Sequence, residues 1–437
     1  MLACISLLVL SATALPLEVT GPWTVSVGPG SVTLDGKTVT VAESAVFEIA
    51  PPPFIEVRNE IRPNIPLFNP KAGGWVKGAR AEKLMAEECS ATGALLPDSL
   101  VLKPEPEGAP FKRGVDYEMD PFWATFGRLE GGAIGEFQKI FVDYDCTLSR
   151  LDSIVADADG KLRLVRGVPA PALALPFNPE PGETVVANIF VPAGCEKLSA
   201  ENLFPVEKTA PVPVATGKEA EALLPKTLAK LREGGVVTIV AFGDSVTNGG
   251  GVGDKKELWY QNVFAARLRE RFPKAEVRMR TAAWPGGGSR NYLEAPAGGT
   301  YDFQRDVLDP KPDLVTIEFV NDAYLDETTT QPHYAGILEK IQSAGAEVAL
   351  ITPHLVRPDW MKVETLKFDG DPRPYVRGLL RFAAENKVAL ADASALWCQL
   401  HRCGLPYITL LSNAINHPDA RGQALFADAL MALFPEE

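Results

Sequence analysis

The chain has 437 residues and a formal net charge of −13, from 43 basic and 56 acidic side chains. A chain of this length exceeds what one hydrophobic core usually holds, so we expect more than one domain. The excess of negative charge, with no stripe of arginine and lysine to offset it, argues against binding to nucleic acid.

The first segment of the chain is apolar. Residues 2–10 read LACISLLVL, and the small residues Ser11 to Ala14 follow them. This pattern is typical of a signal peptide over residues 1–14 and predicts a secreted or periplasmic protein. The stretch is too short to span a membrane. Because no basic residue precedes Lys37, the alternative is an N-terminal buried strand.

Residues 17–205 have the pattern of strands. In Ser31 to Val41 and in Leu151 to Arg166, apolar and polar residues alternate around a turn, and Asp159-Gly160 is a typical hairpin tip. Proline and glycine interrupt these runs, and only Ala79 to Glu88 has the pattern of a short helix. The pattern predicts an all-β sandwich of jelly-roll type.

Residues 206–217 read as an extended linker, and helices and strands alternate over residues 218–437. Strands are predicted near Val236, Val277, Leu314, Val348 and Val388. Helices are predicted at Lys218 to Glu233, Leu258 to Arg271, Pro332 to Ala344, Tyr375 to Asn386 and Asp419 to Leu433. Such alternation predicts a parallel sheet with helices on both faces, which is an α/β domain of three layers.

Ser245 directly follows the first of these strands. Residues Val240 to Gly250 read VAFGDSVTNGG, an apolar strand that runs into a turn. Gly243 permits a tight turn, and Asp244 suits such a bend through hydrogen bonds to the local backbone. A serine at this corner lies at the carboxyl edge of the sheet, where open α/β folds bind ligands.

Three later segments stand at strand ends or just before a helix. They are GGGSRNY at Gly286 to Tyr292, EFVND at Glu318 to Asp322, and NAINHPD at Asn413 to Asp419. Serine, glycine, asparagine and histidine therefore occur in that order. The order and the local contexts resemble the SGNH (GDSL-type) hydrolase family over about Val236 to Pro435.

The resemblance implies a flavodoxin-like sheet and a role for each of these residues. Ser245 would be the nucleophile and His417 the base that takes its proton. The oxyanion of the tetrahedral intermediate would be stabilised by the N–H of Ser245, the N–H of Gly286 or Gly287, and the side-chain amide of Asn321.

Two positions depart from the family pattern. Phe319 stands where the third segment usually has glycine, and Ala414 stands where the last segment usually has the aspartate that orients the histidine. Three explanations are open. Asn413 or a backbone carbonyl orients His417, a carboxylate from elsewhere such as Asp419 does so, or the site is impaired. We favour the first.

Other motifs fail on inspection. The glycines from Gly249 to Gly253 match neither the phosphate-binding loop nor the dinucleotide fingerprint. His354 is also expected at a strand's carboxyl end, but no group of histidine, cysteine and acidic residues has metal-ligand spacing. We therefore expect neither a catalytic metal nor a cofactor.

The sequence thus predicts a secreted serine esterase that hydrolyses acyl esters, most simply acetyl esters, on a carbohydrate such as a polysaccharide. Four aromatic residues near the motifs are candidates for stacking on sugar rings, namely Trp259, Tyr260, Trp284 and Tyr292. The alternatives are a lipase or thioesterase of the same family and a non-catalytic glycan-binding protein on a degraded hydrolase scaffold.

Overall fold

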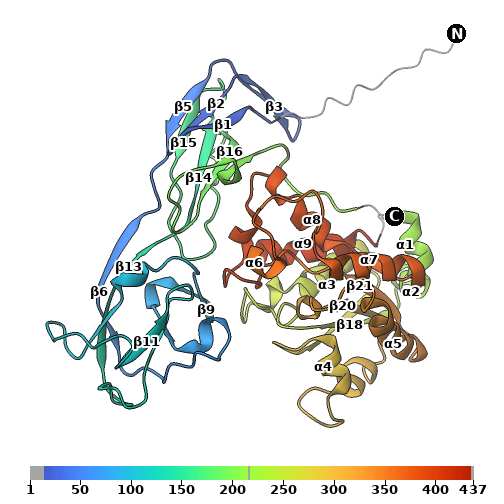
Figure 1. Cartoon of the computed structure of the whole chain (residues 1–437). Helices are drawn as coiled ribbons and strands as arrows, with labels where there is room; N and C mark the ends of the chain where they lie inside the picture. Colours follow the sequence, from blue (N-terminus) through green and yellow to red (C-terminus); the bar gives the residue numbers. More distant parts are fainter. Residues whose placement is uncertain (1–13, 215–216, 435–437) are drawn as a thin grey trace.

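The computed structural model of the protein describes residues 14–214 and 217–434, so the predicted signal peptide lies, apart from Ala14, outside the described residues. A β-rich half and an α/β half lie side by side (Figure 1). The β-rich half ends near Pro205, and the α/β half begins at the helix that starts at Gly217.

The β-rich half consists of short strands, and every pairing between its named strands is antiparallel. The strands are β1 (Leu17–Gly21), β2 (Thr24–Val27), β3 (Gly30–Leu34), β4 (Lys37–Val41), β5 (Ala45–Glu48), β6 (Phe54–Arg62), β7 (Ala79–Arg80), β8 (Met85–Ala86), β9 (Cys89–Ser90), β10 (Val101–Lys103), β11 (Tyr117–Asp120), β12 (Thr125–Arg128), β13 (Ile140–Thr147), β14 (Arg150–Ala156), β15 (Leu162–Val165), β16 (Thr184–Val191) and β17 (Leu203–Pro205). The predicted all-β character is confirmed.

These strands surround two hydrophobic clusters. One cluster takes buried residues from both ends of the region, such as Val25 and Ile189. The other takes residues from the middle, such as Leu102 and Val142. The two clusters belong to the upper and lower portions of this half in Figure 1, and the long strand β6 leads from one portion to the other. Asp159-Gly160 lies in the connection between the paired strands β14 and β15, as predicted.

In the α/β half, five parallel strands alternate with helices. The strands are β18 (Val236–Gly243), β19 (Glu276–Ala283), β20 (Leu314–Glu318), β21 (Glu347–Ile351) and β22 (Ala389–Ala391). The helices are α1 (Gly217–Leu223), α2 (Pro225–Glu233), α3 (Tyr260–Arg271), α4 (Ser289–Glu294), α5 (Thr330–Ser343), α6 (Pro358–Met361), α7 (Pro374–Asn386), α8 (Ala393–Cys398) and α9 (Ala420–Met431). The predicted helix at Lys218 to Glu233 is two helices, because Pro225 starts a new one.

The order of the strands across the sheet is β19-β18-β20-β21-β22, and all four pairings are parallel. In chain order this is 2-1-3-4-5, the order of flavodoxin-like folds. The predicted three-layer sheet is confirmed. Because the strands are parallel, the loops that follow them meet at one edge.

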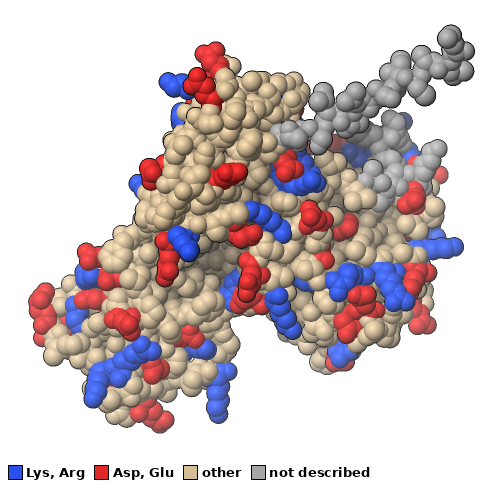
Figure 2. All heavy atoms as spheres, turned by 45° about the horizontal axis from the view of Figure 1, so that its top comes forward, with Lys and Arg blue, Asp and Glu red and all other residues tan. Residues whose placement is uncertain are grey.

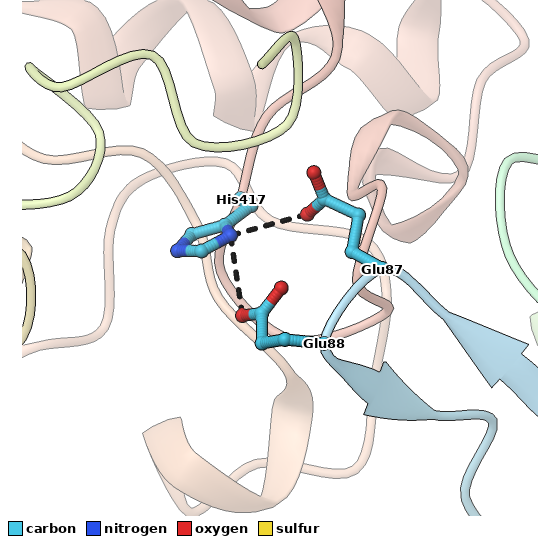
Figure 3. Close-up of side chains that lie close together, drawn as sticks. All are labelled: Glu87, Glu88 and His417. Atoms are coloured by element: carbon cyan, nitrogen blue, oxygen red, sulfur yellow. Dashed lines mark hydrogen bonds and ion pairs between the residues drawn. The ribbon is translucent and has the colours of Figure 1, made fainter.

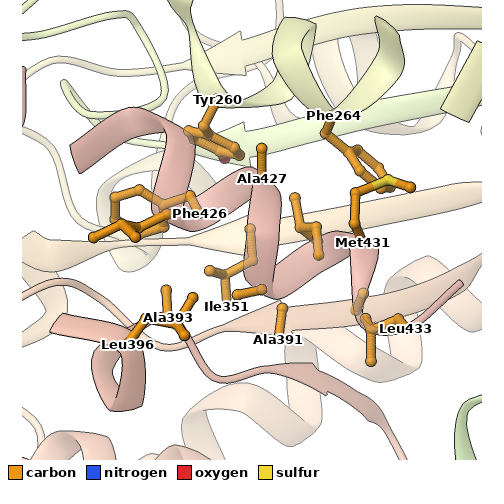
Figure 4. Close-up of a cluster of buried hydrophobic side chains, with 14 of the residues drawn as sticks. Tyr260, Phe264, Ile351, Ala391, Ala393, Leu396, Phe426, Ala427, Met431 and Leu433 are labelled. Atoms are coloured by element: carbon orange, nitrogen blue, oxygen red, sulfur yellow. The ribbon is translucent and has the colours of Figure 1, made fainter. Parts of the chain in front are cut away.

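Helices bury apolar side chains on both faces of this sheet. Val240 and Phe242 pack with residues of α4, α5 and α7, whereas Val237 and Ile239 pack with residues of α2, α3 and α9. Successive side chains of β18 thus point to opposite faces of the sheet, as the geometry of a strand requires. Figure 4 shows part of the cluster that contains Val237 and Ile239. In this cluster Tyr260 and Phe264 of α3 lie near Phe426 and Met431 of α9.

The two halves are in contact. The guanidinium of Arg357 lies 4.4 Å from the ring centroid of Trp123, and the buried Asn188 amide donates to the carbonyl of Gly404 at 2.8 Å. Cys89 and Trp123 pack against Ile415 in a small buried cluster. In the face drawn in Figure 2 the surface is hollowed between the two lobes, and acidic and basic side chains are interspersed over it. Over the residues that the structure describes, no helix has both the length and the apolar character needed to cross a bilayer.

Candidate active site

Ser245 stands at the end of β18, at the sheet edge where it was predicted. Gly243 closes the strand where a side chain would not fit, because a Cβ there would overlap Thr247 and the carbonyl of Glu318. The serine side chain is partly exposed, whereas its neighbours Asp244 and Val246 are buried. The turn therefore presents one hydroxyl group to solvent.

Asp244 ties this turn to the loop after β20. One carboxylate oxygen accepts the N–H of Val246 at 3.0 Å, and the other accepts the N–H of Asn321 at 2.9 Å. Burial raises the pKa of Asp244 to about 7, in opposition to these two hydrogen bonds. The buried carboxyl group thus fixes Asn321 relative to Ser245.

His417 lies on the loop before α9, and its ring contacts Ser245. The Nε2 atom is 3.1 Å from Ser245 Oγ, so the hydroxyl can donate to this nitrogen when the ring is neutral and Nε2 carries no proton. The predicted pair is therefore brought together from segments that are 172 residues apart.

Asn413 and Asp419 do not contact the imidazole ring, in contrast to our prediction. Asn413 is buried and its Oδ1 accepts the N–H groups of Ile415, Asn416 and His417, so it shapes the loop rather than the ring. Asp419 caps α9 by accepting the N–H groups that begin the helix, and it pairs with Arg421 at 2.8 Å. Each side chain uses one oxygen to accept backbone N–H groups, a common role of Asn and Asp at turns and N-caps.

Two glutamates of the β-rich half occupy the position beside the ring. Glu87 Oε2 lies 3.1 Å and Glu88 Oε1 lies 3.3 Å from His417 Nδ1, as Figure 3 shows. The two residues form the tip of a hairpin in which Ala86 pairs with Cys89, between β8 and β9. The short helix predicted at Ala79 to Glu88 is wrong: a 3-10 turn at Glu82–Leu84 leads into this hairpin.

The α/β half holds this hairpin tip in place. Glu87 accepts the N–H of Gly251 at 3.1 Å through its other oxygen, and Glu88 accepts the side-chain amide of Asn413 at 3.0 Å. Glu87 has a φ of 51°, a left-handed conformation that is uncommon for a glutamate. Such a conformation persists only where the surrounding contacts determine it.

The two carboxylates change the charge state of His417. Burial disfavours the charged ring, but hydrogen bonds to Glu87 and Glu88 outweigh it and raise the pKa of His417 to about 9. Burial also opposes the ionised form of Glu88, yet its bond to His417 lowers the pKa of that carboxyl group to about 2. The arrangement stabilises an imidazolium, the species that forms when histidine accepts a proton from serine.

The predicted oxyanion donors lie at the same edge. Asn321 Nδ2 donates to the carbonyl of Gly287 at 3.3 Å, which leaves the second hydrogen of this amide available. The N–H of Gly287 is used, since it donates to the carbonyl of Trp284 at 3.0 Å. Within residues 14–214 and 217–434, the N–H of Gly286 has no such partner, so Gly286 is the better candidate of the two.

The glycine-rich loop after Ser245 packs against the histidine. A Cβ at Gly250 would lie 2.9 Å from both His417 Cδ2 and the carbonyl of Ser245. Gly251 has a φ of 92°, and a Cβ there would overlap the carbonyl of Pro418. These glycines permit close approach of two backbone segments rather than binding of a phosphate.

Residues 241–425, which include Ser245, Asn321 and His417, match the model of the GDSL-like lipase/acylhydrolase family. The C-terminal half of the chain is therefore similar to GDSL-like acylhydrolases. No curated protein matches the chain.

Several solved structures align with about half of the chain. A two-domain esterase active on acetylated mannans aligns at 20% identity over 49% of this chain and 52% of its own, with a TM-score of 0.40. This chain thus spans about half the length of that esterase. A variant of an acetyl-xylooligosaccharide esterase from Geobacillus Stearmophilus aligns at 18% identity over 46% of this chain and 95% of its own, with a TM-score of 0.36.

Most of the other residues singled out from the sequence lie outside the Ser245 site. His354 is fully buried, and its Nε2 donates to the carbonyl of Asn416 at 2.8 Å. Burial lowers the pKa of His354 to about 3, so the ring is neutral and supports the loop that carries His417. Of the four aromatic candidates, Tyr260 and Tyr292 are buried in the core and Trp284 stacks on Tyr301. Only Trp259 lines the depression at Ser245.

Glu87, Glu88 and His417 also have the composition of a small metal site. Their ligand atoms lie within 4.8 Å of one another. The Nδ1 atom, however, is already shared by two carboxylates, and Nε2 faces Ser245. An ion bound there would coordinate Nδ1 and replace the hydrogen bonds that hold the ring in position for Ser245.

The two glutamates are the functional candidates that sequence reasoning missed. Glu87 stands 330 residues before His417, in the other half of the chain, and neither residue belongs to a recognisable motif. The one available signal was the absence of the family aspartate at Ala414, which indicated that a carboxylate should be sought elsewhere.

Proposed function

We propose that the protein is a serine esterase that hydrolyses acyl esters, most simply acetyl esters, on a carbohydrate. The observation that carries this proposal is the chain of contacts from Ser245 through His417 to Glu87 and Glu88. The Ser245–His417 distance is 3.1 Å, and the His417–Glu87 distance is also 3.1 Å. Nucleophile, base and orienting carboxylate are the three roles that such catalysis needs.

In the proposed first step, Ser245 Oγ attacks the ester carbonyl carbon while His417 Nε2 accepts the serine proton. The C–O π electrons move to the oxygen, which becomes the oxyanion between the N–H groups of Ser245 and Gly286 and the amide of Asn321. The oxyanion then re-forms the carbonyl, the ester bond breaks, and His417 returns the proton to the departing sugar hydroxyl.

In the second step, water hydrolyses the acyl-Ser245 ester by the same route. His417 Nε2 takes a proton from the water as it attacks, and returns it to Ser245 Oγ when the acid leaves. In both steps the carboxylates of Glu87 and Glu88 stabilise the charged ring through Nδ1. Neither carboxylate needs to take up the proton.

The shape of the site supports a carbohydrate ester over a long-chain lipid. The depression at Ser245 has a volume of about 460 Å³, and its lining is rich in glycine and charged residues, including Asp254 and Lys256. A long acyl chain needs an apolar channel, because burying apolar surface drives its binding. A sugar ester instead presents hydroxyl groups for polar partners.

Rates on a series of esters test the proposal. We expect hydrolysis of para-nitrophenyl acetate and release of acetate from acetylated polysaccharides, with rates that fall as the acyl chain of the aryl ester lengthens to octanoate. Ser245→Ala should abolish both activities. A lipase would instead show rates that rise with chain length. A glycan-binding protein would retain affinity for the polysaccharide without turnover in either form.

A further inference from the structure

A second depression adjoins the site on the side of Asn321. It has a volume of about 680 Å³ and lies between the loop that follows β20 and the short helix α6. Asn321 and Asn416 both line it, and Asn416 is the chain neighbour of His417. A group held in this depression is therefore next to the proposed oxyanion donor and to the catalytic loop.

Two large aromatic side chains on the walls of this depression are exposed. Tyr324, on the loop after β20, is 58% exposed, and Trp360, on α6, is 47% exposed. Rings of this size usually bury most of their surface, so two exposed ones lining one depression are informative. An aromatic face matches the C–H face of a sugar ring, and the phenol and indole groups can still bond to hydroxyls.

The same depression offers polar groups for sugar hydroxyls. The side chains of Lys362 and Asp326 line it and are exposed, and Asn321 and Asn416 also line it. A binding site with apolar walls and a few polar groups is the usual composition of a small-molecule site in proteins. Here the mixture suits a ligand that has both C–H faces and hydroxyl groups.

Trp360 is also held in position. The guanidinium of Arg357 lies 5.6 Å from the ring centroid of Trp360 and 4.4 Å from that of Trp123 in the β-rich half. Arg357 is itself fixed by a pair with Asp359 at 2.5 Å. A wall that is ordered before the ligand arrives loses less conformational entropy on binding.

We propose that this depression, which we call the Tyr324–Trp360 groove, binds the sugar units adjacent to the acylated one, with the two rings stacking on them. The inference rests on the proposed function and deepens it: the substrate is an oligosaccharide or polysaccharide rather than an acylated monosaccharide. The small aryl ester reaches Ser245 without filling this groove.

The test compares a small aryl ester with two acetylated pentaoses in four variants. Trp360→Ala and Tyr324→Ala remove a ring each, Trp360→Phe retains a ring, and Phe137→Ala is the matched control, because Phe137 is 81% exposed and lines neither depression. Steady-state rates are measured with para-nitrophenyl acetate and with acetylated xylopentaose and mannopentaose. We expect each alanine variant to lose about tenfold in kcat/KM on a pentaose and little on the aryl ester. Trp360→Phe should recover part of the loss.

Two results would overturn the groove while leaving the esterase intact. One is an equal change on the pentaoses and the aryl ester in the alanine variants. The other is a wild-type protein that hydrolyses both pentaoses no faster than an acetylated monosaccharide.

Binding separates failure of the groove from failure of the proposed function. In the Ser245→Ala protein, titration calorimetry with the same pentaoses should give binding that Trp360→Ala weakens about tenfold. If the wild type hydrolyses no ester, this result still supports the groove. Equal affinity with and without the Trp360 ring contradicts it.

Discussion

His417 Nδ1 lies 3.1 Å from Glu87 Oε2, although the two residues are 330 positions apart and belong to different halves of the chain. In a self-contained acylhydrolase domain the orienting carboxylate comes from the loop that bears the histidine, which here carries Ala414 at that position. The hairpin of the β-rich half supplies two carboxylates instead. In the proposed mechanism the β-rich half therefore takes part in catalysis, beyond any role in recognising substrate.

Ser245→Ala should abolish turnover and leave the protein folded, because the side chain stands at a partly exposed turn and contributes little to the core. Labelling by a serine-directed fluorophosphonate checks this without a natural substrate. The wild type should be labelled and the variant should not. Equal labelling of both proteins would show that another serine is the nucleophile.

Asn321→Ala should lower kcat by about a hundredfold to a thousandfold with little change in KM, because an oxyanion donor acts mainly in the transition state. Steady-state kinetics on the aryl acetate measure both constants. Asn386→Ala, at the end of α7, is the control and should match the wild type. An effect confined to KM would assign Asn321 to ground-state binding.

Gly250→Ala should reduce activity more than stability, because the new Cβ would press on the His417 ring at 2.9 Å. We expect a loss of about tenfold or more in kcat with a modest decrease in the melting temperature. Gly336→Ala is the matched control, since a Cβ at Gly336 of α5 meets nothing within 4 Å. Wild-type kcat in Gly250→Ala would mean that the loop moves freely away from the ring.

Ala414→Asp restores the residue type of the family pattern and should not raise the rate. Ala414 has a φ of 59° and lines a mainly apolar cavity of about 320 Å³ between the two halves, together with Phe122 and Leu173. A carboxylate there should destabilise the fold by about 1–3 kcal/mol, because the left-handed backbone and the mainly apolar lining both disfavour an aspartate. Thermal unfolding and kcat are measured together, and a gain in kcat of tenfold or more would contradict this account of the loop.

The sequence predicted those parts of the molecule that depend on local patterns. Alternation of apolar runs located all five parallel strands. The position of Ser245 after a strand and that of His417 before the last helix indicated that the two side chains lie at one edge of the sheet. The hairpin at Glu87 was not predictable in the same way. Its two acidic residues have the pattern of a helix end. Their role depends on a contact with His417 in the other half, which no local pattern indicates.

Two of the four aromatic candidates are unsuited to stacking on a sugar for a related physical reason. Tyr260 and Tyr292 were singled out by their distance from the motifs along the chain, but both are buried in the core, where large rings contribute most to stability. Trp360, which lies far from any motif in sequence, lines the groove beside Asn321. The degree of burial distinguishes aromatic residues of the core from those that line a groove, and burial depends on the tertiary structure.

The pH dependence of kcat/KM tests the central claim most directly, since the claim is that Glu87 and Glu88 hold His417. The base must be neutral to accept the serine proton, and with a pKa of about 9 it is mostly protonated at neutral pH. For the wild type we therefore expect kcat/KM on the aryl acetate to rise with pH up to about 9.

The decisive variant is Glu87→Gln combined with Glu88→Gln, and Glu82→Gln, an exposed glutamate before the same hairpin, is its control. Removing both carboxylates should lower the pKa of His417, so the acidic limb should move to lower pH while the plateau falls by about a hundredfold or more. The control should follow the wild-type curve. An unchanged limb and plateau in the double variant would contradict the account, because His417 would then be oriented without the β-rich half.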